Sequence, residues 1–134
     1  MKDYSSIRHI TYIESERYLR TSVKSWSEEK ELSYLGLESI AELEKALPSN
    51  LSFVFVVGRV SPIKGTLDEL LASENAINNI RKHFPEARIV LYSDLPFDTF
   101  NKIFKNKSLS FYSKKLFTPR QLVEKLERTF FNSI

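Results

Sequence analysis

The sequence predicts an α/β protein of the (βα)5 type, in which a five-stranded parallel sheet carries helices on both faces. Three observations support this prediction. Short segments rich in β-branched and aromatic residues alternate with longer amphipathic ones along the 134-residue chain, as expected for repeated strand–helix units. The segment 53–57 is continuously apolar, as a parallel strand buried on both faces requires. No internal repeat or linker interrupts the alternation, which predicts a single domain over residues 1–134.

Five segments favour strands for different reasons. In chain order, the first and fourth are rich in β-branched and aromatic residues. The second alternates apolar and polar residues weakly, the third is wholly apolar, and the fifth places two aromatic residues between serines. We expect these strands at residues 7–13, 31–36, 53–57, 88–93 and 109–113.

Five further segments favour helices because their apolar residues recur near helical spacing. Ser15 is expected to cap the first helix. Ser39 and Glu42 form a capping-box pattern at the second, and Thr118 precedes a proline at the first turn of the last. We expect these helices at residues 15–27, 39–47, 67–83, 96–105 and 119–131.

The composition excludes several classes of function. The chain has no cysteine and two histidines, which argues against disulfides, thiolate chemistry and histidine-rich metal sites. Its three glycines are too widely spaced for a dinucleotide fingerprint or a P-loop. We therefore expect no cofactor and no metal ion. No apolar segment suited to a signal peptide opens the chain, and its longest apolar run is too short to cross a membrane. We expect a cytoplasmic protein without a membrane contact.

The formal charge of +3 is unevenly distributed. Residues 1–50 hold 7 basic and 9 acidic groups, a net −2, whereas residues 51–134 hold 13 and 8, a net +5. A basic C-terminal part could attract nucleic acid or an acidic partner. A solvated helical surface of mixed charge explains the same composition, so we do not expect nucleic-acid binding by this domain alone.

Polar residues gather where the predicted strands end, and ligands of such sheets bind beyond the carboxyl ends of the strands. They are Glu14, Ser15 and Glu16 after the first strand, Gly58 and Arg59 after the third, Tyr92, Ser93 and Asp94 at the fourth, and Lys115 after the fifth. This edge of the sheet is where the sequence places any chemistry.

Nearly the whole chain resembles the receiver domain of two-component response regulators, which has a flavodoxin-like fold. The segment 113–122, Ser-Lys-Lys-Leu-Phe-Thr-Pro-Arg-Gln-Leu, is similar to the K-P-F-x-P-x-x-L segment that opens the last helix of that family. The segment 13–15, Ile-Glu-Ser, resembles the acidic pair after the first strand. The segments 56–58 and 89–93 resemble the strands that end at the phosphoacceptor and at the switch hydroxyl.

The resemblance implies a degenerate receiver, or pseudo-receiver. In the family an aspartate at the end of the third strand attacks a phosphoryl donor. The matching position here is Gly58, which has no side chain and cannot accept a phosphoryl group. A slip in register restores no nucleophile, because no aspartate lies between Leu51 and Leu67.

The other pocket positions are altered as well. The acidic pair that holds Mg²⁺ in the family is Glu14 and Ser15 here, so one carboxylate is missing. Tyr92 stands where a small switch hydroxyl is expected, and Lys115 matches the lysine that contacts the phosphoryl oxygens. The resemblance therefore implies a pocket without catalytic residues and without a metal site.

Receivers dock their partners through the face formed by the fourth helix, the fifth strand and the fifth helix. We expect exposed aromatic and basic residues on this face to bind a signalling protein or a second copy of the chain. They are Phe100, Phe104, Tyr112, Lys114 and Arg120.

These observations favour a non-enzymatic signalling module that acts through protein–protein contact, as a regulatory or adaptor domain of a two-component-type system. Two alternatives stay open. One is a flavodoxin-like domain that senses a small molecule or anion near Lys115 and Arg59, at the carboxyl ends of the strands. The other is a flavodoxin-like enzyme that uses Glu14 or Asp94 as a general base.

Overall fold

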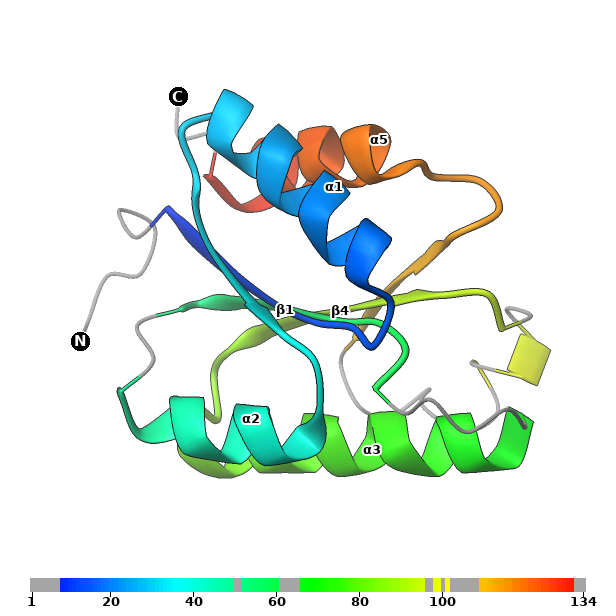
Figure 1. Cartoon of the computed structure of the whole chain (residues 1–134). Helices are drawn as coiled ribbons and strands as arrows, with labels where there is room; N and C mark the ends of the chain where they lie inside the picture. Colours follow the sequence, from blue (N-terminus) through cyan, green and yellow to red (C-terminus); the bar gives the residue numbers. More distant parts are fainter. Residues whose placement is uncertain are drawn as a thin grey trace.

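Five parallel strands form the centre of the molecule in the computed structural model, which describes residues 8–49, 52–60, 66–95, 98–99, 101 and 109–131 (Figure 1). The strands are β1 (His9–Ile13), β2 (Ser33–Leu37), β3 (Val54–Val57), β4 (Arg88–Ser93) and β5 (Ser110–Ser113). They lie in the order β2-β1-β3-β4-β5, and each neighbouring pair is parallel. The chain therefore has the α/β architecture that the sequence predicts.

Helices cover both faces of the sheet. They are α1 (Arg17–Glu29), α2 (Ile40–Ala46), α3 (Thr66–His83) and α5 (Pro119–Leu126), with a 3-10 turn η1 (Leu47–Ser49) after α2 and a π-helical turn η2 (Glu127–Phe131) after α5. Figure 1 shows α1 beside α5 on one face and α2 beside α3 on the other. Within the described ranges, no helix has both the length and the apolar character that a membrane span needs.

The observed ends of the elements test the predicted helix signals. Thr118 is confirmed as the N-cap of α5, where Gln121 completes a capping box, and Ser39 caps α2. The prediction for Ser15 is wrong, because the N-cap of α1 is Glu16 and no side chain caps this helix. The N–H of Ser15 instead donates to the Arg59 carbonyl at 2.6 Å, which holds the chain against the loop after β3. The helix predicted at 96–105 falls largely outside the described residues.

The sheet separates two hydrophobic cores, and the alternation of side chains along each strand assigns residues to them. β3, which is buried along its whole length, sends Val54 and Val56 toward α1 and α5, and Phe55 and Val57 toward α2 and α3. The even-numbered core residues of the other strands likewise face α1 and α5. This parity decides which side chains can meet beyond the carboxyl ends of the strands.

The half-buried His9 of β1 predicts a pH dependence of stability. Burial lowers its pKa below the ordinary value of 6.5. Between that value and the lower folded pKa, the unfolded chain binds more protons than the folded one. We therefore expect the free energy of unfolding to fall as the pH drops below about 6.5, and to fall less in His9→Gln. Urea titrations of both proteins at several pH values measure this, and identical pH dependences would contradict it.

Candidate functional site

Residues from three strands converge on one face of the sheet beyond its carboxyl edge. The register pairs Tyr12 of β1 with Val56 of β3, and both side chains face α1 and α5. Glu14 and Gly58 lie two positions after Tyr12 and Val56. Because side chains alternate between the two faces along a strand, Glu14 and Gly58 are on the same face as Tyr12 and Val56. Lys114 follows β5 directly. Its number is also even, so the alternation of side chains places it on this face as well. The fold therefore brings a carboxylate, a glycine and an ammonium group together.

The carboxylate of Glu14 lies at the centre of this site and is completely buried. Its Oε1 accepts hydrogen bonds from Lys114 Nζ at 2.8 Å and from the Tyr12 hydroxyl at 2.8 Å. The same oxygen accepts from the Arg59 backbone N–H at 3.2 Å, and Oε2 accepts from the Glu16 N–H at 3.2 Å. A charge taken out of water needs such compensation, because its desolvation is expensive unless it is paired and hydrogen-bonded.

Gly58 leaves the space that this carboxylate fills. A Cβ atom at position 58 would overlap Glu14 Oε1 and would lie 3.1 Å from a ring carbon of Tyr12. A side chain at position 58 and the observed conformation of Glu14 therefore exclude each other. The carboxylate of Glu14 stands where a side chain of residue 58 would begin.

The lysine of the site is Lys114, which corrects the assignment of Lys115 from the sequence. The N–H of Lys114 donates to the Ser93 carbonyl at 2.9 Å, so the ladder between β4 and β5 continues for one residue. Strand alternation then directs Lys114 to the face of Glu14, and its side chain is only 10% exposed. Lys115 is exposed, and its N–H is held by Ser113 Oγ at 3.1 Å.

Tyr92 lies near the end of β4, and Ser15 lies two residues after the end of β1. The Tyr92 side chain is buried, its hydroxyl donates to the Phe117 carbonyl at 2.6 Å, and Lys114 Nζ lies 5.8 Å from the centre of its ring. A fixed aromatic ring therefore fills the position where a small switch hydroxyl was expected. Ser15 follows Glu14 at the end of β1 and contributes no second carboxylate.

The tyrosines of the site are held in their neutral, hydrogen-bond-donating form. Burial, followed by the Glu14 charge, raises the pKa of Tyr12 well above its ordinary value. Burial, with smaller contributions from Asp94 and Glu14, raises the pKa of Tyr92 to about 12. The negative charge of Glu14 is thus balanced by Lys114 and supported by a hydroxyl that stays protonated.

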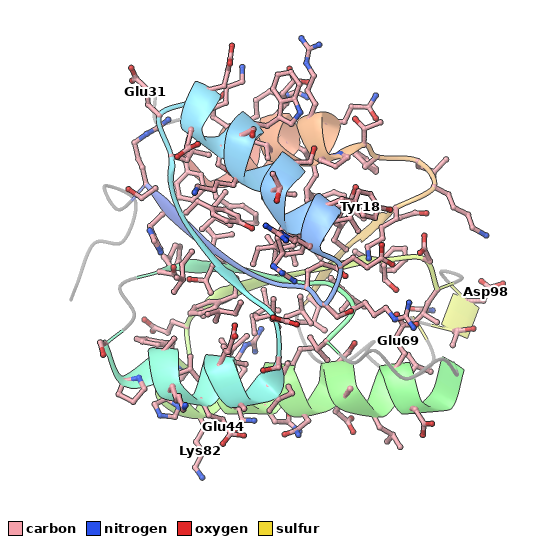
Figure 2. All side chains as sticks on the ribbon, in the orientation of Figure 1. Tyr18, Glu31, Glu44, Glu69, Lys82 and Asp98 are labelled. Atoms are coloured by element: carbon pink, nitrogen blue, oxygen red, sulfur yellow. The ribbon has the colours of Figure 1, made fainter. Side chains whose placement is uncertain are left out.

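A surface cavity of about 370 Å³ opens beside this cluster, between α1 and the turn before α5. Its lining includes Glu16, Asp94 and the paired Lys114. Tyr18 of α1 (Figure 2) also lines the cavity and is 68% exposed. Among the described residues of this lining, Lys114 is the one cation and is matched by Glu14, and Glu16 is itself paired with Arg59 at 3.7 Å, so they offer no unmatched positive charge. This does not favour the small-anion ligand that the sequence left open.

The residues expected on the docking face have different surroundings. Lys114 points into the buried cluster, so its assignment to that face is wrong. Tyr112 is half-buried, and Arg120 is exposed with its guanidinium over an indole ring. Phe100 and Phe104 lie outside the described residues.

Sequence reasoning missed the part played by Tyr12, which it treated only as a strand residue. The signal that could have found it is the two-residue spacing from Glu14, which places both side chains on one face of β1. The same counting along β5 selects Lys114 over Lys115 only once the structure shows that the pairing of β4 and β5 continues past Ser113.

The solved structures that resemble this chain include receiver domains of response regulators. A CheY-like receiver domain from Methanospirillum hungatei JF-1 gives a TM-score of 0.76 at 12% identity, covering 93% of this chain and 94% of that one. A response regulator from Thermotoga maritima gives 0.72 at 18%, covering 90% and 94%. The beryllofluoride-activated NtrC4 receiver domain dimer gives 0.72 at 17%, covering 92% and 96%. No family model and no curated protein matches the sequence.

At these identities the likeness establishes the fold, so the resemblance to receivers is confirmed at that level. The fold family implies Mg²⁺, and the residues of this chain do not fit it. Both oxygens of Glu14 already accept from protein donors, one of them an ammonium group, and Ser15 offers no carboxylate. Within the described part of the chain, no three Asp, Glu or His side chains gather as metal ligands.

The buried ion pair predicts strong coupling between its partners. Lys114→Met leaves the Glu14 carboxylate without its countercharge, and we expect a loss of about 3–5 kcal/mol in the free energy of unfolding. Glu14→Gln alone should also destabilise the fold, whereas Glu14→Gln with Lys114→Met should cost less than the sum of the two. Denaturant unfolding of the four proteins measures this coupling, and additive losses would contradict it.

The overlap at position 58 predicts a second coupling. Gly58→Ala should destabilise the protein by about 1–3 kcal/mol, because the new methyl group displaces a carboxylate held by several donors. In a Glu14→Ala background the same substitution should cost much less, since the overlapping oxygen is gone. The two unfolding free-energy differences provide the comparison. An equal cost in both backgrounds would show that Gly58 does not make room for Glu14.

Proposed function

We propose that this chain is a phosphorylation-independent pseudo-receiver, a signalling module that acts through protein contacts in a two-component-type system and catalyses no reaction. The observation that carries the proposal is the Glu14 carboxylate, which is buried over Gly58 and bonded to Lys114. The receiver fold supports the signalling role, and the altered pocket supports independence from phosphorylation.

The pocket lacks the parts that acyl-phosphate chemistry needs. Attack on a phosphoryl donor requires a nucleophilic oxygen with open access, and Gly58 supplies none. The nearest carboxylate, Glu14, is completely buried and its oxygens are occupied by hydrogen bonds. A phosphoryl group would bring further negative charge to a carboxylate whose only described ammonium partner is Lys114.

The same contacts support a pocket that keeps one conformation without being phosphorylated. In receivers the pocket lysine contacts the phosphoryl oxygens, so its charge partner arrives with the signal. Here the partner belongs to the chain itself, because Lys114 Nζ lies 2.8 Å from Glu14 Oε1. Tyr92 is likewise fixed by its bond to the Phe117 carbonyl. The conformation of the surface that partner proteins bind would therefore not depend on a phosphoryl donor.

Phosphoryl transfer is tested most simply by incubating the protein with acetyl phosphate and Mg²⁺ and measuring its intact mass. We expect no hydroxylamine-sensitive gain of one phosphoryl group. We expect none in Gly58→Asp either, because Ser15 supplies no second carboxylate to hold Mg²⁺. An active receiver in parallel confirms the reagent. A labile phosphoryl group on the wild-type chain would overturn the proposal.

The partner face is proposed to include Phe100, Phe104, Tyr112 and Arg120, and a second copy of the chain is one candidate partner. The NtrC4 receiver, which shares the fold, forms a dimer in its beryllofluoride-activated state. We expect Phe104→Ala with Arg120→Glu to weaken self-association while leaving the far-UV circular dichroism unchanged.

Light scattering on size-exclusion fractions measures that association, and Lys45→Glu on α2 serves as the control on the opposite side of the sheet. A protein that associates equally in wild-type and variant form would exclude this face as the dimer contact.

A further inference from the structure

We propose that the open edge of β2, together with the basic face of α1, binds an extended acidic peptide segment of a partner protein, which adds to the sheet as a strand. This deepens the proposed function by naming a contact surface and the chemistry of what it takes. The surface does not include Gly58 or Lys114, so it can fail while the phosphorylation result stands.

The geometry of β2 exposes backbone groups that a peptide could pair with. β2 is an edge strand of the sheet. On its inner side the Ser33 N–H donates to the Arg8 carbonyl at 2.8 Å, and the Leu37 carbonyl accepts from the Glu14 N–H at 2.8 Å. Because backbone groups of a parallel strand alternate in direction, those of the even-numbered residues point away from β1.

These outward residues are Tyr34 and Gly36, and they lie in a groove of about 370 Å³ between β2 and α1. The Tyr34 hydroxyl donates to the Arg20 carbonyl at 2.9 Å, so its ring spans from the strand to the helix. A Cβ at position 36 would meet that hydroxyl oxygen at 2.8 Å. Glycine at position 36 therefore leaves room for the Tyr34 ring beside the strand.

Among the described residues, β2 itself lacks three common protections against strand addition. Natural edge strands are commonly blocked by charged side chains, by proline or by a bulge. The sequence of β2, Ser-Tyr-Leu-Gly-Leu, contains neither a charge nor a proline, and it pairs with β1 in unbroken register. This absence of protection is expected where pairing with another chain is the function.

The helix wall of the groove supplies the charge preference. Arg17, Arg20 and Lys24 line it from one face of α1, whereas no carboxylate is among its lining residues, which are all described. Arg20 is anchored by donating to the Glu14 carbonyl at 2.6 Å. Within the described residues, neither Arg17 nor Lys24 forms an ion pair with a carboxylate.

Arg17, the first of these cations, stands where the helix itself disfavours a positive charge. Arg17 opens α1, and the first turn of this helix has no acidic residue. Helix dipoles favour negative groups at the N-terminus and disfavour positive ones. Residues whose charge is locally unfavourable are expected at functional surfaces. A strand-forming peptide with acidic side chains on alternate positions would satisfy both the backbone groups and the cations.

A fluorescein-labelled peptide that alternates Glu and Val tests the proposal by fluorescence polarisation. We expect saturable binding to the wild-type chain. Arg17→Glu with Lys24→Glu should weaken it by at least about tenfold. The matched control, Lys45→Glu with Lys82→Glu, makes the same charge change on the opposite layer, where Lys82 points away from the sheet (Figure 2), and should leave binding within about twofold of wild type.

Backbone pairing is tested separately. Amide hydrogen exchange should slow at Tyr34 and Gly36 when the peptide is bound, and should change little at Ser33 and Leu37, which already bond inward. The same peptide with alternate backbone nitrogens methylated should bind at least about tenfold more weakly.

Three results would overturn the proposal. The first is no binding at about 1 mM peptide. The second is equal binding of the methylated peptide, which would indicate attraction between charges without strand addition. The third is tighter binding of a single-stranded oligonucleotide of equal charge, which would assign the basic groove to nucleic acid.

Discussion

The buried carboxylate of Glu14 is the constraint on which the rest of the site depends. Its oxygens accept from a lysine side chain, a tyrosine hydroxyl and two backbone N–H groups. These donors come from β1, from the loop after β3, from the chain before α1 and from the turn after β5. One charge therefore ties together segments that are up to 100 residues apart in sequence.

This constraint also explains the glycine at position 58. In an active receiver the carboxylate at the end of the third strand must be reachable by a phosphoryl donor. Here a carboxylate from the first strand reaches into the same region, and it can do so only because Gly58 has no side chain. The glycine at position 58 and the burial of Glu14 are thus two aspects of one packing arrangement, in which Lys114 pairs with a carboxylate of the chain itself.

The strand and helix pattern was predictable because it depends on local periodicity and on caps such as Thr118. Gly58, Glu14 and Tyr92 were singled out together because each stands at the end of a strand, and the structure places Glu14 against Gly58. The choice between Lys114 and Lys115 was not, because it depends on how far the β4–β5 ladder continues past Ser113. That length is set by tertiary hydrogen bonding, which neither composition nor resemblance contains.

The most direct test of this account is a crystal structure of the protein grown with Mg²⁺ and beryllofluoride, which imitates a phosphoryl group on a carboxylate. The account predicts that neither species binds at the carboxyl edge, and that Lys114 Nζ stays hydrogen-bonded to Glu14 Oε1 as in the 2.8 Å contact described above. A structure in which Lys114 leaves Glu14 and contacts beryllofluoride, or in which Glu14 binds Mg²⁺, would contradict it.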